Sequence, residues 1–137
     1  MAATLEIDVE LDGETSFLAK NAQGAELRLD GPSEPAGGSL RPMEAVLAAL
    51  AGCGSIDVAE ILRKQRQPLE GLSIKVSGTR ADSVPAVFTR IEIAFTARGA
   101  VAPEKLRQAV DLSLDKYCSV ARMLQPGVEI VARTEVA

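Results

Sequence analysis

The sequence from Arg41 to Arg66 reads RPMEAVLAALAGCGSIDVAEILRKQR, and it predicts the helix around which the fold is organised. Between Met43 and Cys53 the only charged residue is Glu44, and the apolar residues point in every direction of a helix with 3.6 residues per turn. A helix without a water-facing stripe has to be covered on all sides. We therefore expect this half of the helix to be buried, and the thiol of Cys53 to lie deep.

Beyond Cys53 the pattern becomes amphipathic, with an apolar face opposite a charged face. The apolar face holds Val58, Ile61 and Leu62, and the charged face holds Asp57, Glu60 and Lys64. Two glycines, Gly52 and Gly54, flank the cysteine although each costs roughly 1 kcal/mol relative to alanine inside a helix. Their presence indicates that another backbone or a substrate packs closely beside the thiol.

Strict alternation of apolar and polar residues predicts strands on both sides of this helix. The expected strands are residues 4–11, 15–20, 26–29, 72–79, 88–97 and 128–135. Turns at Asp12-Gly13 and at residues 21–24 join the first three strands into a meander, and we expect the first strand to be half-buried. Residues 31–42 are rich in proline and glycine, which fits an ordered arm and a flexible linker equally well.

A second helix is predicted from Pro103, with apolar spacing that persists to Leu124. The order of elements is therefore three strands, a helix, two strands, a helix and a last strand. Strands that follow one another directly predict antiparallel pairing, so the fold class is α+β rather than alternating parallel α/β. A chain of 137 residues fits a single domain, residues 1–137.

Composition excludes several classes of function. The net charge is −4, and three phenylalanines and one tyrosine are the only aromatic residues, so neither a basic surface nor a stacking platform for nucleic acid is expected. The first residues lack the features of a signal peptide, and no run of about 18 uncharged apolar residues occurs, which predicts a cytoplasmic protein without a membrane partner. Without histidine and with two cysteines, the chain offers none of the usual zinc ligand sets, so no metal and no cofactor are expected.

The two cysteines carry the candidate chemistry. If Ser113 or Asp115 interrupts the second helix, Cys118 falls in the first turn of a new segment, where free amides and the helix dipole lower a thiol pKa. If the helix runs through, Cys118 is an ordinary buried small hydrophobe, and the same interpretation fits Cys53 taken alone. As a pair in a reducing compartment, the two residues suggest a redox dithiol.

Three segments carry a resemblance to a known family: RPMEAVLAALAGCGSIDVAEIL, VFTRIEIAF and AVDLSLDKYCSVARML. In matching order over essentially the whole chain, they resemble the OsmC/Ohr family of thiol-dependent peroxidases, and most closely its OsmC-like branch. The resemblance implies an OsmC-like fold in which antiparallel sheets wrap two central helices in an intertwined homodimer. It also places the active sites at the interface between the subunits.

In that family the cysteine that matches Cys53 attacks an organic hydroperoxide, and the one that matches Cys118 resolves the sulfenic acid to a disulfide. A dithiol or a lipoyl protein then reduces the disulfide. In the well-studied peroxidases of that family an N-terminal arginine keeps the attacking cysteine ionised, and a glutamate near the start of the cysteine helix positions the arginine. The position of that glutamate falls on Met43 here, with Glu44 one residue further and about 100° around the helix. The candidates for the activating cation are Lys20, Arg28, Arg41 and Arg80.

Two other functions remain open from the sequence. One is a non-catalytic OsmC-like dimer that binds a small hydrophobic or thiol-reactive ligand in the same cleft. The other is a redox sensor that signals through oxidation of Cys53 and Cys118. The missing glutamate at Met43 favours the binding dimer.

Overall fold

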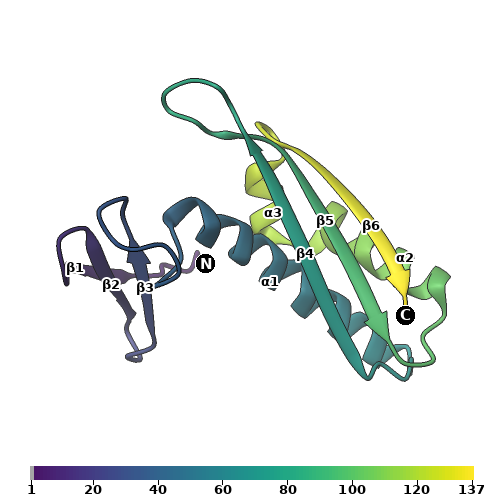
Figure 1. The fold of residues 1–137 in the computed structure, drawn as a ribbon. Helices are drawn as coiled ribbons and strands as arrows, with labels where there is room; N and C mark the ends of the chain where they lie inside the picture. Colours follow the sequence, from purple (N-terminus) through teal and green to yellow (C-terminus); the bar gives the residue numbers. More distant parts are fainter. Residues whose placement is uncertain (1) are drawn as a thin grey trace. The chain divides into compact units, whose positions relative to one another are not determined.

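The computed structural model describes residues 2–137, which divide into two compact units, residues 2–46 and residues 47–137. The helix α1, Pro42–Lys64, begins within the first unit and lies mostly in the second. Each unit is described by itself, with its elements labelled in Figure 1. The prediction of one domain over residues 1–137 stays a prediction.

The first unit contains the predicted meander. Its strands are β1 (Ile7–Leu11), β2 (Ser16–Asn21) and β3 (Glu26–Asp30), paired antiparallel in the order β1-β2-β3. The register sets Val9 opposite Ala19 and Leu11 opposite Phe17, so apolar side chains share one face of this sheet. At the second turn, Gly24 has a φ of 89° and the Asn21 side chain accepts the amides of Gln23 and Ala25.

The apolar face of this first sheet is not covered. We use that name for the side that carries Ile7, Val9, Leu11, Phe17 and Leu27, which are 59%, 53%, 62%, 40% and 47% exposed. The prediction that the first strand is half-buried is therefore wrong for the single chain, because every residue of β1 is exposed. The alternation correctly predicted a strand with one apolar face, but in the described residues 2–137 this face is exposed.

Residues 31–41 form an ordered arm, which decides between the two interpretations of this glycine- and proline-rich segment. The guanidinium of Arg41 donates hydrogen bonds to the backbone carbonyls of Gly31 and Glu34. The arm also returns to β3, where the amide of Asp30 donates to the carbonyl of Leu40 at 3.0 Å. These contacts fix the segment that leads into α1.

The second unit contains the sheet β4-β5-β6, with β4 at Gly71–Arg80, β5 at Phe88–Arg98 and β6 at Glu129–Val136. The predicted antiparallel pairing holds for β4 and β5, but β5 and β6 are parallel. The reason is that helical residues cross between them: α2 (Pro103–Leu112), the π-helical turn η1 (Ser113–Tyr117) and α3 (Ser119–Leu124). Such a crossover carries the chain from the end of the sheet where β5 finishes back to the end where β5 began, so β6 runs in the same direction as β5.

The core of this unit lies between the sheet and its helices, which occupy one face of the sheet (Figure 1). As the alternation predicted, Ile91, Ile93, Phe95 and Ala97 of β5 are fully buried. Helical residues cover them: Leu50, Val58 and Leu62 from α1, and Leu106, Ala109 and Val110 from α2. The core therefore holds α1 and the α2–η1–α3 segment on the same side of the sheet, which is the condition for their cysteines to meet.

The first half of α1 is less covered than its sequence predicts. Of residues 43–53 only Leu50 is buried, and Cys53 is half-buried rather than deep. An exposed stripe of small and apolar residues runs along the helix at Ala48, Ala49, Gly52 and Ile56. By length and composition alone α1 could also cross a membrane, with a mean hydropathy of 1.8 over a window that is 22% buried, but core helices of soluble proteins pass the same test.

Candidate functional site

The first cysteine is presented by α1, whose start is fixed locally. Pro42 occupies the first turn, and the carboxylate of Glu44 accepts the backbone amide of Arg41 at 2.8 Å, as in a capping box. Glu44 therefore serves the end of the helix. Cys53 lies in the middle of the helix, and Asp57 follows one turn later on the same face, since residues four apart are neighbours on a helix.

The second cysteine lies at a break between two helices, as one of the two interpretations of the sequence required. After α2 the chain forms the turn η1, and Cys118 adopts an extended conformation with φ −75° and ψ 105°. Its Sγ accepts the amide of Ala121 at 3.4 Å, so Cys118 is itself the N-cap of α3. Neither Ser113 nor Asp115 caps the new helix.

The fold brings Cys53 and Cys118 together. The two Sγ atoms and a carboxylate oxygen of Asp57 all lie within 4.8 Å of one another, and both thiols are free. This proximity is what a redox dithiol requires, because a disulfide bond of about 2.05 Å can then form with small side-chain movements. The two predicted site residues, Cys53 and Cys118, therefore lie close together in the structure.

Asp57 belongs to the cysteine cluster, although the sequence predicted it on the charged, water-facing side of the helix. Its spacing within the amphipathic pattern predicted a water-facing side chain, but its Oδ2 accepts a hydrogen bond of 3.0 Å from the fully buried hydroxyl of Ser113. The same hydroxyl lies 3.4 Å from the carbonyl of Gly54. The available signal was the spacing of four residues from Cys53, which sets the carboxylate on the side of the helix that carries the thiol.

The electrostatic surroundings keep Cys118 protonated. Burial is the largest cause and, together with Cys53 and the negative charge of Asp57, raises the pKa of Cys118 to about 11, against the lowering effect of the Ala121 amide. The expectation that a position at the start of a helix lowers this pKa is wrong. The helix amide is present and lowers the pKa, but the side chain of Cys118 is 2% exposed. Desolvation of the thiolate raises the pKa by more than one amide lowers it.

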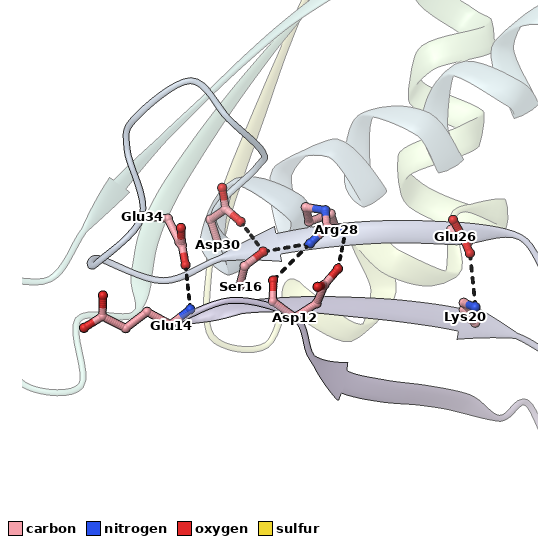
Figure 2. A network of polar contacts seen from close by, with 8 residues as sticks. All are labelled: Asp12, Glu14, Ser16, Lys20, Glu26, Arg28, Asp30 and Glu34. Carbon is pink, nitrogen blue, oxygen red and sulfur yellow. Dashed lines mark hydrogen bonds and ion pairs between the residues drawn. The ribbon is translucent and has the colours of Figure 1, made fainter.

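The basic residues considered as activating cations all have partners close to them in sequence or in the same sheet. Figure 2 shows Arg28 paired with Asp12 and with the Ser16 hydroxyl, and Lys20 paired with Glu26 at 3.3 Å. Arg41 donates to the carbonyls of the arm, and Nε of Arg80 donates to the carbonyl of Ala86 at 2.8 Å. Each of the four side chains therefore has a partner within its own sheet, arm or loop.

A cavity of about 560 Å³ opens beside Asp57 in the second unit. Its apolar wall comes from Ile61 and Leu112, and Tyr117, which directly precedes Cys118, lines it as well. Lys64 contributes a positive charge to the same wall. Asp57 belongs both to this lining and to the cysteine cluster, so its carboxylate is the group that the cavity and the cluster share.

Comparison with known proteins identifies the family. The family model of the OsmC-like protein matches residues 34–133. The chain is 40% identical over 122 residues to protein YhfA of Escherichia coli strain K12, which covers 88% of this chain and 90% of that protein. These matches include the cysteine helix and the segment that carries Cys118.

Solved structures agree on the fold. A hypothetical protein from Aquifex aeolicus VF5 superposes with a TM-score of 0.90 at 34% identity, covering 99% of this chain and 98% of that one. An organic hydroperoxide resistance protein OsmC from Legionella pneumophila shares the fold with a TM-score of 0.71 at 16% identity, covering 100% of this chain and 98% of its own. With an α+β fold of two three-stranded sheets and a matching family model over most of its length, the chain belongs to the OsmC-like protein family.

Proposed function

We propose that this chain is a thiol-dependent peroxidase that reduces organic hydroperoxides to alcohols. The observation that carries the proposal is the approach of the Cys53 and Cys118 sulfurs within 4.8 Å of each other. The Cys53 thiolate attacks the distal peroxide oxygen, so the O–O bond breaks, the alcohol leaves after taking a proton, and Cys53 becomes a sulfenic acid. The Cys118 thiol then displaces water to give the disulfide, which two reducing thiols, supplied by a dithiol or a lipoyl protein, convert back.

The roles of the two cysteines follow from their surroundings. A peroxide has to reach the attacking sulfur, and Cys53 is half-buried whereas Cys118 is 2% exposed. A raised pKa also makes Cys118 a poor primary nucleophile at neutral pH, because the thiolate is the reactive species. Cys53 is therefore the peroxide-reactive residue in this proposal, and Cys118 is the resolving one.

The proposal includes a homodimer. The exposed apolar face of the first sheet and the exposed stripe on α1 each comprise several neighbouring residues rather than isolated surface hydrophobes, and these residues are exposed in the part of the chain that the structure describes. At Gly52 an added Cβ would meet no atom within 4 Å, so the glycine has no role inside this subunit and instead leaves room for close approach of another helix. A second copy of the chain supplies complementary apolar surfaces of both kinds.

One observation favours the alternative of a non-catalytic binding dimer. The carboxylate of Asp57 disfavours a thiolate at Cys118, and each of the four candidate cations has another partner. Together with Met43 in place of the family glutamate, these surroundings suit a protonated Cys118 beside a ligand cavity. The two functions differ in what an organic hydroperoxide does to the thiols.

The deciding experiment mixes reduced protein with cumene hydroperoxide and counts free thiols over time. A peroxidase loses both thiols promptly, Cys53→Ser keeps its remaining thiol, and Cys118→Ser overoxidises Cys53 to sulfinic acid, which mass spectrometry detects. Ser119→Ala, at an exposed position beside Cys118, is the matched control and behaves as the wild type. Thiols that survive an excess of peroxide in the wild type contradict the peroxidase and support the binding dimer.

A further inference from the structure

We propose that the reduced chain binds one Zn²⁺ ion through Cys53, Cys118 and Asp57, and that oxidation of the two cysteines releases the ion. The proposal goes beyond the peroxidase activity and does not depend on it, because it requires only the reduced thiols and the carboxylate. The expectation of no metal rested on the absence of histidine and on the presence of just two cysteines. The fold adds a third potential ligand, Asp57, which the spacing between the cysteines does not predict.

The geometry of the three donors fits a tetrahedral ion. Zinc binds thiolate sulfur at about 2.3 Å and carboxylate oxygen at about 2.0–2.2 Å, which sets ligand atoms about 3.5–3.8 Å apart. The Sγ atoms and the carboxylate oxygen lie within 4.8 Å of one another, so binding closes the cluster by about 1 Å at most. Three protein ligands leave the fourth position to water.

The kinds of donor select the ion. Two soft thiolates exclude Mg²⁺ and Ca²⁺, which prefer sites made of oxygen ligands. The hard carboxylate of Asp57 argues against Cu⁺, which prefers sulfur alone, and suits Zn²⁺ as a borderline ion. The donors are also held by other groups, as in established zinc sites. The Ser113 hydroxyl donates a hydrogen bond to Oδ2 of Asp57, and the Ala121 amide donates one to Sγ of Cys118.

A cation can reach the carboxylate of Asp57 from solvent. The cavity of about 560 Å³ has Asp57 in its lining, and Glu60 adds a second carboxylate to the same wall. Two acidic groups against the single Lys64 give the cavity a negative balance that favours entry of a cation. The ion then replaces the thiol protons, because thiolates rather than thiols are zinc ligands.

Binding is linked to the redox state because both ligands are consumed when the disulfide forms. With an organic hydroperoxide as the oxidant, the two thiolates give up two electrons, and the peroxide takes these electrons and two protons to become an alcohol and water. The Cys53–Cys118 bond forms, and Zn²⁺ leaves with only the carboxylate remaining. The bound ion in turn withholds the thiolates from peroxide, so it inhibits the peroxidase cycle until it is removed.

The test is a titration of the fully reduced wild-type protein with Zn²⁺ under anaerobic conditions, in competition with a coloured chelator. We expect one tight site per chain, and no such site after the pair has been oxidised to the disulfide or after the thiols have been alkylated. Cd²⁺ in place of Zn²⁺ gives a thiolate-to-metal charge-transfer band, which weakens in both Cys53→Ser and Cys118→Ser because each variant loses one of the two thiolate ligands. Neither readout uses a peroxide, so failure of the peroxidase assay leaves this result unaffected.

Two further variants separate a built site from casual thiol binding. Asp57→Asn weakens Zn²⁺ binding, and Ser113→Ala, which removes the hydrogen bond to the carboxylate, weakens it by about 10–100-fold. Asp111→Asn removes a carboxylate from an exposed surface outside the cavity, where Asp111 pairs with Arg107 at 2.9 Å, and it keeps the wild-type affinity within about threefold. Circular dichroism checks that each variant is folded. Absence of a stoichiometric site in the reduced wild type, or an Asp57→Asn variant with unchanged affinity, would overturn the proposal.

Discussion

The buried hydroxyl of Ser113 donates a hydrogen bond of 3.0 Å to the carboxylate of Asp57, across 56 residues of sequence. Ser113 begins the turn η1, and Asp57 follows Cys53 by one turn of α1. This contact ties the two cysteine-bearing segments together beside the thiols, and it fixes a negative charge there. The charge has consequences for both the acidity of Cys118 and the metal affinity of the pair.

Asp57→Asn is expected to lower the pKa of Cys118. The negative charge of Asp57 contributes to the rise to about 11, so its removal makes the thiolate easier to form, while burial, the largest cause, remains and keeps the pKa above that of an ordinary cysteine. The measurement is the ultraviolet absorbance of the thiolate against pH in a Cys53→Ser background, where Cys118 is the only thiol.

The same titration of a protein that lacks both thiols is subtracted to remove the signal of Tyr117. Asp111→Asn is the matched control, since Asp111 lies on the neighbouring α2 and pairs with Arg107 at 2.9 Å on an exposed surface. This control leaves the titration of Cys118 where it was. An Asp57→Asn curve that coincides with the control curve contradicts the role given to the Asp57 charge.

The stability of the reduced protein is expected to fall as the pH rises from about 9 through about 11 in part because of Cys118. Its pKa is higher in the folded chain, about 11, than the 9.0 of a free thiol, so the folded state holds this proton more tightly. The contribution is fully present below the unfolded pKa and is lost as the pH passes the folded pKa.

Urea unfolding in the presence of a reductant measures this contribution across that pH window. Lysine and tyrosine titrate in the same range, so the informative quantity is the difference between wild type and Cys118→Ala at each pH. The variant curve is expected to be flatter between pH of about 9 and about 11. Parallel curves for the two proteins mean that Cys118 does not hold its proton more tightly in the folded chain.

Phe95→Ala is expected to cost about 3–5 kcal/mol of unfolding free energy. Phe95 is fully buried in β5, and its ring lies against α1, where a Cβ added at Gly54 would be 3.6 Å from its tip. The variant loses apolar burial and leaves a cavity between the sheet and the cysteine helix. Urea unfolding at one fixed protein concentration measures the loss, because association with a second copy would otherwise change the apparent stability.

Met123→Ala is the control for the Phe95→Ala variant. Met123 is 80% exposed on α3, so its truncation changes the unfolding free energy by about 0.5 kcal/mol or less. If Phe95→Ala costs as little as the control, the core between β5 and α1 is not packed as described.

Much of the fold could be predicted because its signals are local. Alternation along β5 identified Ile91, Ile93 and Phe95 as core residues, and the apolar helix around Cys53 was found from its spacing. The site needed information that local patterns do not contain. The periodicity of the sequence predicted Asp57 on a charged, water-facing side of the helix. Periodicity contains no information about contacts with distant segments, such as the hydrogen bond from Ser113.

The acidity of Cys118 was mispredicted for a related reason. The start of a helix is visible in a sequence, but the desolvation that outweighs it depends on how completely other elements cover the thiol. On β1 and α1 the error has the opposite sign, because apolar residues that the sequence predicted to be buried are exposed. The apolar pattern identified surfaces that are exposed in the described residues, and the partner proposed for them is a second copy of the chain.

That partner leads to the last prediction, in which Gly52→Leu is expected to separate the dimer without unfolding the subunit. Inside the chain the change is harmless, because a Cβ at Gly52 meets no atom within 4 Å and leucine is favoured over glycine in a helix by roughly 1 kcal/mol. Between two subunits the added bulk blocks the close approach of helices that the glycine allows. Val9→Asp is expected to act in the same direction by placing a charge on the apolar face of the first sheet.

Sedimentation of wild type and variants over a range of concentrations measures the effect, with Glu10→Gln on the opposite face of β1 as the control that stays dimeric. Circular dichroism distinguishes a folded monomer from an unfolded chain. A Cβ at Gly52 meets no atom within 4 Å inside the chain. A variant that is folded but monomeric, beside a dimeric wild type, therefore indicates that the added side chain blocks the approach of a second helix. A wild type that sediments as a monomer at all concentrations, or a Gly52→Leu dimer as tight as the wild type, rules out the proposed use of this stripe.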